Sequence, residues 1–361
     1  MGTDIISITN LTTAQIQELV ASLGESPYRA SQLQHWVYQE FALSFNEMTN
    51  LPKPLRQKLA EQTSLHSITP LQEVVGQDGT TKILFALPDG KTIESTLMYY
   101  PADTGRWRYT VCLSTQVGCP IGCPFCATGQ QGFERNLTPD EIIDQVLYFS
   151  RRLKDRAKPK ENSHITNLVF MGMGEPLANY DTLWSAIRML NSPEGFGMGA
   201  RHMTISTSGL VPQIRRLSGE SLEIGLAISL HASENTLRNR LVPINQKYPL
   251  QQLIPACREY LAKTGRRPSF EYVLFNGIND SVEDARSLAK LLGGLNCHVN
   301  LIPANTTTNP QFRPPEPGAV LAFERELQRL NISCTLRRGM GLDIAAGCGQ
   351  LRSHLREKTA K

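Results

Sequence analysis

The sequence of 361 residues lacks the segments that place a protein in a membrane or direct it out of the cell. It has no run of about 18 or more apolar residues, which excludes a conventional transmembrane helix. Its N-terminus lacks a basic start, an apolar core and a small-residue cleavage site, so we expect a cytoplasmic protein. Eight cysteines are too few for a disulfide scaffold, and in a reducing compartment clustered cysteines favour metal or catalytic roles.

The first hundred residues change from a helical to a strand-like pattern. Residues 13–23 carry apolar side chains at the 3.6-residue period, and two further helical stretches follow. The stretches LQEVVG, TTKILFAL and KTIESTLMYY are separated by Asp-Gly turns, the strongest short hairpin signal. We therefore predict a helical accessory domain over residues 1–66, with RNA recognition as a candidate role, and a small antiparallel β-meander over residues 67–104.

The remaining sequence alternates between apolar strand patterns and amphipathic helix patterns. Such repeated units predict a parallel sheet of the α/β class, here a partial (β/α)6 barrel over residues 105–338. Five of the predicted strands end in small or polar residues, including GMGEPL, STSG, SLHA and IPAN. In a βα barrel the strand ends share one rim, so these endings predict a single pocket. We expect residues 339–361 to be a mobile Gly-rich loop followed by the C-terminal tail.

The stretch GCPIGCPFCATG places Cys119, Cys123 and Cys126 in one loop with C-x3-C-x2-C spacing. A 4Fe–4S cluster is normally held by four thiolates, so three ligands would leave one iron open. A zinc site completed by Cys112 or Cys348, or a purely structural trio, are the alternatives. The spacing, with an aromatic residue before the last cysteine, resembles the radical S-adenosylmethionine (SAM) superfamily, in which the open iron binds SAM.

Several motifs in the same order resemble one branch of that superfamily, the radical SAM RNA adenine methyltransferases. They are CLSTQVGCPIGCPFCATGQQGFERNLT, FMGMGEPL, STSGLVP, AISLHA and AAGCGQL. The resemblance implies methylation of adenosine at carbon 2 in 23S ribosomal RNA and, beside the anticodon, in transfer RNA; carbon 8 of the same ribosomal adenosine is the alternative. It also implies a 4Fe–4S cluster and SAM as cofactors. The implied SAM-binding residues are Gly174, Glu175, Ser206, Ser229, Leu230, His231 and Asn305.

The resemblance further implies three catalytic residues. Cys348 would carry a methyl group taken from a first SAM, and Cys112 would attack the sulfur of Cys348, forming a disulfide that releases the product. Glu94 would be the base that removes the adenine proton. From the residues alone, Cys348 could be a plain loop thiol, Glu94 a solvent-facing strand residue, and His231 a core residue. The tail departs from the family pattern at Met340, Ala345 and Gly347, where Arg, Asp and Ala are usual.

The expected partners are RNA and an electron donor such as flavodoxin or ferredoxin, and we expect a monomer. A net charge of +4 is compatible with RNA, and GRWRYT at residues 105–110 interleaves arginines with aromatic side chains that can stack on bases. The alternative for this stretch is an edge strand with exposed arginines. Residues 1–66 hold only four Lys and Arg against six Asp and Glu. A non-catalytic protein that binds metal and RNA is the alternative from another class.

Overall fold

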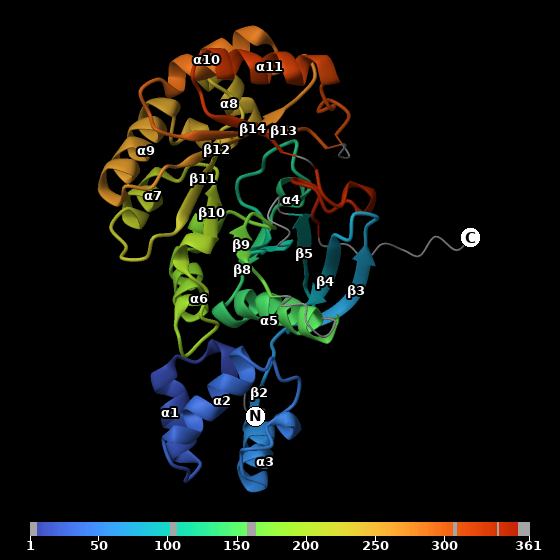
Figure 1. The fold of residues 1–361 in the computed structure, drawn as a ribbon, viewed down its shortest axis with the longest axis vertical. Helices are drawn as coiled ribbons and strands as arrows, with labels where there is room; N and C mark the ends of the chain where they lie inside the picture. The colour runs from blue at the N-terminus through green and yellow to red at the C-terminus, as the bar shows by residue number, and fades with distance from the viewer. Residues whose placement is uncertain (1–5, 102–106, 157–163, 306–308, 338, 353–361) are drawn as a thin grey trace, which may run out of the picture.

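A computed structural model of the chain describes residues 6–101, 107–156, 164–305, 309–337 and 339–352. Its body is one sheet of ten strands in the order β14-β13-β12-β11-β10-β9-β6-β5-β4-β3 (Figure 1). Within this sheet, β6 and the strands β9 to β14 pair in parallel, whereas β3 with β4, β4 with β5 and β5 with β6 pair antiparallel. The bounds are β3 Thr69–Val75, β4 Thr81–Ala86, β5 Thr92–Pro101, β6 Trp107–Cys112, β9 Asn167–Phe170, β10 Met203–Thr207, β11 Gly225–Ser229, β12 Ser269–Leu274, β13 His298–Pro303 and β14 Cys334–Leu336.

The predicted partial (β/α)6 barrel with an antiparallel meander is confirmed. The meander is continuous with the barrel, because β5 pairs with β6 from Thr96↔Cys112 to Pro101↔Trp107. The last strand, β14, adds a further parallel strand beside β13. Because the meander and the barrel form one sheet, side chains of β4 and β5 can lie close to the strand ends of the barrel.

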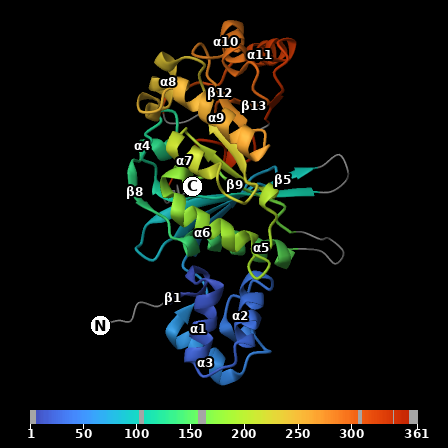
Figure 2. The same ribbon diagram turned by 90° about the vertical axis from the view of Figure 1, so that its left-hand side faces the viewer.

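Helices cover the outer side of the parallel strands, with α5, α6, α7 and α9 together on the face seen in Figure 2. Their apolar faces explain their positions; in α10, for example, the buried side chains are Ala285, Leu288, Ala289 and Leu292, and Ser281 completes a capping box with Asp284. The bounds are α4 Ala127–Gln130, α5 Pro139–Arg156, α6 Tyr180–Asn191, α7 Val211–Leu217, α8 Asn235–Leu241, α9 Leu250–Thr264, α10 Val282–Leu292 and α11 Pro317–Arg329. The short 3-10 turns of the barrel are η3 Pro176–Asn179, η4 Ala200–His202, η5 Pro243–Gln246 and η6 Leu342–Ile344.

The N-terminal part is helical, as predicted, and lies at one end of the molecule (Figure 1). Its elements are β1 Ile6–Ser7, η1 Ile8–Asn10, α1 Thr13–Ser22, α2 Tyr28–Tyr38, η2 Phe45–Glu47, α3 Lys53–Gln62 and β2 Thr63–Ser64, with β1 parallel to β2. The buried Asp144 of α5 connects this part to the barrel, because its carboxylate accepts hydrogen bonds from the Thr9 and Ser67 hydroxyls, both at 2.8 Å.

Two hydrophobic clusters stabilise the structure. The larger extends from the N-terminal helices through the barrel. The smaller lies at the carboxyl ends of the strands and includes Ala232, Val273, Phe275 and Ile302, with Cys123 and Phe125 packed against it. Between these strand ends, β7 Gln116–Gly118 and β8 Phe133–Asn136 form a two-stranded ribbon that brackets the cysteine loop.

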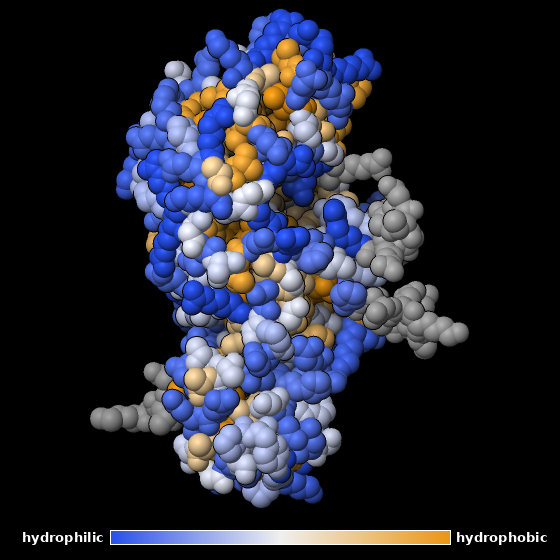
Figure 3. All heavy atoms as spheres, turned by 60° about the vertical axis from the view of Figure 1, so that its left-hand side comes forward, coloured by the Kyte–Doolittle hydropathy of each residue, from blue (hydrophilic) through white to orange (hydrophobic). Residues whose placement is uncertain are grey.

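The surface drawn in Figure 3 is mostly hydrophilic, with hydrophobic side chains in separate patches. Among the described residues, no helix is both long and apolar enough to span a membrane.

Candidate functional site

The cysteine loop is anchored at the mouth of the barrel by backbone hydrogen bonds and an aromatic side chain. The Cys119 N–H donates to the Gly132 carbonyl at 2.8 Å, and the Cys126 N–H donates to the Cys123 carbonyl at 3.1 Å. The Phe125 ring lies 5.2 Å from the His231 ring and 5.2 Å from the Phe275 ring, centroid to centroid. The aromatic residue before the last cysteine therefore holds the loop on the strand ends.

The thiols of this loop are free and influence one another electrostatically. Burial raises the pKa of the Cys119 thiol to about 12. Burial, followed by the charges of Cys126 and Cys119, raises the pKa of Cys123 well above its ordinary value. Within the described residues, no three His, Cys, Asp or Glu side chains converge tightly enough to hold a single metal ion.

The end of β9 places Gly174 and Glu175 beside this loop. Gly174 has φ +107, and a Cβ there would lie 2.7 Å from the Gln116 Cβ, so both its conformation and its surroundings require glycine. The buried Glu175 carboxylate accepts hydrogen bonds from the Ser208 N–H and hydroxyl, both at 2.7 Å, and from the Leu177 N–H at 3.1 Å. Burial raises the pKa of Glu175, and the bonds from Ser208 oppose that rise.

Arg238 of α8 connects the ends of β10 and β11, and sequence reasoning missed it. Its side chain is 0% exposed. Its guanidinium donates to the carbonyls of Ser208 at 2.6 Å, Ser229 at 3.1 Å and Leu230 at 3.1 Å, and to the Asn245 Oδ1 at 2.8 Å. Ser208 is thus held twice, through its N–H and hydroxyl by Glu175 and through its carbonyl by Arg238. The predicted Ser206 is also buried; it lies on β10, two residues before Ser208.

His231 is a buried, neutral residue of the rim. Its backbone is left-handed, with φ +59, a conformation that costs energy for a residue with a Cβ. Its Nδ1 accepts a hydrogen bond from the Val273 N–H at 3.1 Å. Burial and then the charge of Arg238 lower the pKa of His231 to about 3, so the ring stays uncharged at neutral pH. His231 is therefore a buried residue that also contacts the cysteine loop through Phe125.

The Gly-rich loop places Cys348 beside the cysteine loop. The Cys348 carbonyl accepts from the Asn305 amide at 3.1 Å, so the predicted Asn305 contacts the predicted methyl carrier. On the other side, the Gly349 carbonyl accepts from the Ala127 N–H at 2.8 Å, directly after Cys126. The Cys348 residue is exposed in the barrel mouth, yet the surrounding protein raises the pKa of its thiol, with the Arg337 charge opposing.

Cys112 ends β6 inside the barrel and is buried. Burial, followed by the proximity of Cys348, raises the pKa of its thiol to about 12. The structure therefore brings Cys112 and Cys348 near enough for the charge of one to influence the other. All eight cysteines lie in described residues and are free, so the disulfide implied for Cys112 and Cys348 is not present in this structure.

Glu94 is buried, so its interpretation as a solvent-facing strand residue is wrong. The pairing of β5 with both β4 and β6, together with the return of the C-terminal loop, covers it, leaving 6% exposed. One carboxylate oxygen lies 3.0 Å from the Lys82 Nζ, and the other accepts the Arg352 N–H at 2.9 Å. Lys82 was not predicted, and nothing in the local sequence distinguishes it from an exposed strand lysine.

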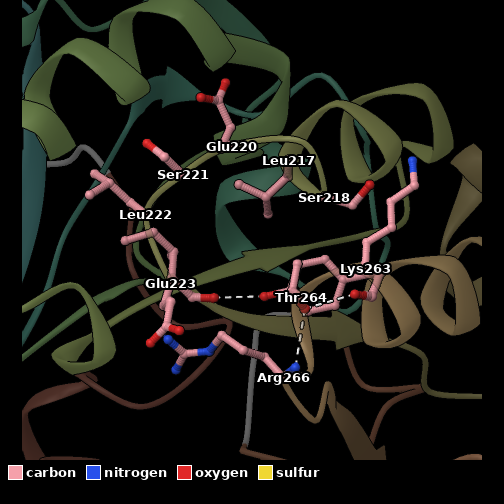
Figure 4. A pocket seen from close by; sticks show the side chains of 11 residues that line it. Leu217, Ser218, Glu220, Ser221, Leu222, Glu223, Lys263, Thr264 and Arg266 are labelled. Carbon is pink, nitrogen blue, oxygen red and sulfur yellow. Dashed lines mark hydrogen bonds between the residues drawn. The ribbon is translucent and has the colours of Figure 1, made fainter.

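Two further features lie outside this site. In the GRWRYT stretch, Arg106 lies outside the described residues, and the Arg108 guanidinium stacks 4.5 Å from the Tyr100 ring centroid. The pocket in Figure 4 is lined mainly by the loop between α7 and β11, together with the last turns of α9 and Arg266. That pocket is therefore at the amino end of β11, opposite to the strand ends that carry the cysteines.

Two protein-family models match the chain. The model of the ribosomal RNA large subunit methyltransferase N-terminal domain matches residues 6–65, and the model of the radical SAM superfamily matches residues 113–289.

Whole proteins also match over nearly the full length. A probable dual-specificity RNA methyltransferase RlmN from Geobacillus kaustophilus is 44% identical over 355 residues, which are 98% of this chain and 94% of the relative. A dual-specificity RNA methyltransferase RlmN from Anaeromyxobacter dehalogenans is 46% identical over 348 residues, 96% of this chain and 92% of the relative. The crystal structure of a radical SAM methyltransferase from Sphaerobacter thermophilus matches with a TM-score of 0.92 at 47% identity, covering 97% of this chain and 100% of that one.

Proposed function

We propose, because this chain belongs to the RlmN family of radical SAM RNA methyltransferases, that it methylates carbon 2 of adenosine in 23S ribosomal RNA and in transfer RNA, using two SAM per turnover. The observation that carries the proposal is the meeting of three groups at one barrel mouth: the three-cysteine loop, Cys348 and Cys112. An RNA-binding protein that only held a metal would need neither of the two extra thiols.

The residues at the mouth fit the cofactors that the family implies. The donor set of Cys119, Cys123 and Cys126 suits a 4Fe–4S cluster with one open iron, which with SAM supplies a radical able to abstract hydrogen from carbon. Glu175 adds a buried carboxylate for the SAM amino group, and it is already oriented by Ser208. The remaining proposed SAM-binding residues are Gly174, Ser206, Ser229, Leu230, His231 and Asn305.

Each catalytic residue has a role that its surroundings support. Cys348, exposed in the mouth, can first accept a methyl group and then present it to adenine. Cys112, buried with a raised pKa, keeps its proton until a covalent adduct on Cys348 needs a thiolate to attack its sulfur. Glu94, paired with Lys82 and bonded to the C-terminal loop, is the proposed base for the adenine proton. The helices of residues 6–62 are the proposed RNA-recognition part.

Anaerobically reconstituted protein incubated with SAM, reduced flavodoxin and a ribosomal RNA fragment tests the reaction. After digestion, mass spectrometry against synthetic standards should identify 2-methyladenosine, and Cys348→Ala should produce none. 8-Methyladenosine would replace the proposed regiochemistry by the alternative. An absence of methyladenosine with one zinc per chain, in place of about four irons, would favour the non-catalytic alternative.

A further inference from the structure

The turn between β3 and β4 grips the C-terminal loop through two reciprocal contacts. The Asp78 carboxylate accepts the Gly341 N–H at 2.7 Å, and the Asp343 carboxylate accepts the Gln77 N–H at 2.9 Å. A Cβ on Gly76 would lie 2.8 Å from the Asp343 Oδ1, so the two segments are in close contact. Each partner thus offers a carboxylate to the other's backbone, and bonds to an ionised acceptor are stronger than neutral ones.

A second pair of contacts comes from the buried Lys82–Glu94 ion pair. The Lys82 ammonium donates to the Ala345 carbonyl at 3.1 Å, and Glu94 accepts the Arg352 N–H at 2.9 Å. The meander therefore binds the loop both before and after Cys348. In Figure 1 the C-terminal loop, drawn in red, lies beside α4 and near the ends of β4 and β3.

Apart from these contacts and the bonds that its backbone carbonyls accept from Asn305, Ala127 and Thr128, the loop is held by few buried apolar side chains. Of its residues 339–352, only Ile344, Ala346 and Leu351 are buried apolar side chains, and Leu342 is 50% exposed. Glycines at four positions increase the conformational entropy that ordering must overcome. The Gly341 and Thr80 N–H groups lower the pKa of Asp78 against the opposing effect of its partial burial, so the carboxylate is ionised at neutral pH.

We propose that Asp78, Asp343 and Lys82 are positioning residues, and that the meander docks the loop so that Cys348 faces the cysteine loop. This inference rests on the proposed role of Cys348 as methyl carrier. It assigns the meander a function within the catalytic cycle. Docking through a few charge-assisted backbone bonds, with little apolar burial, also leaves the loop able to release between the two SAM-dependent steps.

The test compares Asp78→Ala, Asp78→Asn and Asp343→Ala with the wild-type protein. Asp89→Ala is the matched control, because Asp89 lies in the other turn of the meander and binds Arg135, not the loop. Hydrogen–deuterium exchange should show faster exchange at residues 339–352 in both alanine variants. The rate at which deuterated methyl from SAM appears on the Cys348 peptide should fall about tenfold or more, the loss expected from one charge-assisted hydrogen bond.

Asp78→Asn keeps an acceptor oxygen, so its rate of Cys348 methylation should lie between the rates of Asp78→Ala and wild type. The iron content and the thermal unfolding temperature of this variant should equal those of the wild type. Wild-type exchange in both alanine variants would overturn the docking, and faster exchange with a wild-type methylation rate would overturn the positioning role. If wild-type Cys348 gains no methyl at all, the proposed function fails, whereas the exchange measurement still decides whether the meander docks the loop.

Discussion

Replacing Arg238 by methionine removes the buried cation that connects two strand ends of the barrel mouth. The side chain is 0% exposed and donates four hydrogen bonds, three of them to the carbonyls of Ser208, Ser229 and Leu230. Methionine fills similar space but can donate to none of these acceptors. Hydrogen bonds from a charged donor contribute about 1.5–3 kcal/mol each to stability. Part of their loss is offset because the variant no longer has to desolvate a buried charge. We expect the free energy of unfolding to fall by about 3–5 kcal/mol.

Urea unfolding of the cluster-free protein under reducing, anaerobic conditions measures this loss. Arg240→Met is the matched control, because Arg240 lies on the same helix and is exposed, so its change should stay within about 0.5 kcal/mol. Arg238→Lys should be intermediate, since a single ammonium cannot reach acceptors arranged for a planar guanidinium. SAM binding should weaken in both Arg238 variants. Equal unfolding midpoints for Arg238→Met and Arg240→Met would refute the assignment of Arg238 as the connection between the strand ends.

The remaining predictions concern the thiols and carboxylates of the mouth. Cys112→Ala should trap the protein covalently on RNA, and a denaturing gel without a shifted band would contradict its role in release. Because the pKa of Cys112 rises from 9.0 to about 12, iodoacetamide at pH 8 should label it about 1,000-fold more slowly in the folded protein than in urea, as peptide mass spectrometry would measure. The raised pKa of Cys112 also makes stability depend on pH. Above pH 9.0 the unfolded chain loses the Cys112 proton while the folded state keeps it, so the free energy of unfolding should fall as the pH rises. Cys112→Ser should not show this decrease. Glu94→Gln should reduce turnover, and a wild-type rate would remove Glu94 as the base.

The order of the elements could be read from the sequence because local patterns specify them. The Asp-Gly turns predicted the hairpins β3–β4 and β4–β5, and the helical period over residues 13–23 predicted α1, Thr13–Ser22. The strand endings predicted the common rim, since parallel strands bring their carboxyl ends to one edge. The site predicted from these endings depends on chain topology, which local sequence largely determines.

The residues that were missed act through contacts distant in sequence. Arg238 and Arg240 stand two positions apart on one helix, and only the packing of α8 against the strand ends buries the first and exposes the second. The STSG stretch contains both Ser206 and Ser208, and only the contacts of Ser208 with Glu175, 33 residues earlier, and with Arg238 distinguish the two. The alternation of side chains along β5 could not indicate that Glu94 is buried. The C-terminal loop, whose Arg352 N–H bonds to Glu94, begins more than two hundred residues later in the chain.

The departures of the tail from the family pattern also have a structural reading. At Ala345 the contact with Lys82 is made by the backbone carbonyl, and at Gly341 the contact with Asp78 is made by the backbone N–H. These two bonds use the backbone of the loop and are kept when its side chains change, whereas the bonds made by the Asp78 and Lys82 side chains of the meander and by the Asp343 side chain of the loop are lost on substitution. The absence of the usual aspartate at position 345 therefore leaves the attachment of the Cys348 loop intact, and the sensitive positions are Asp78, Lys82 and Asp343.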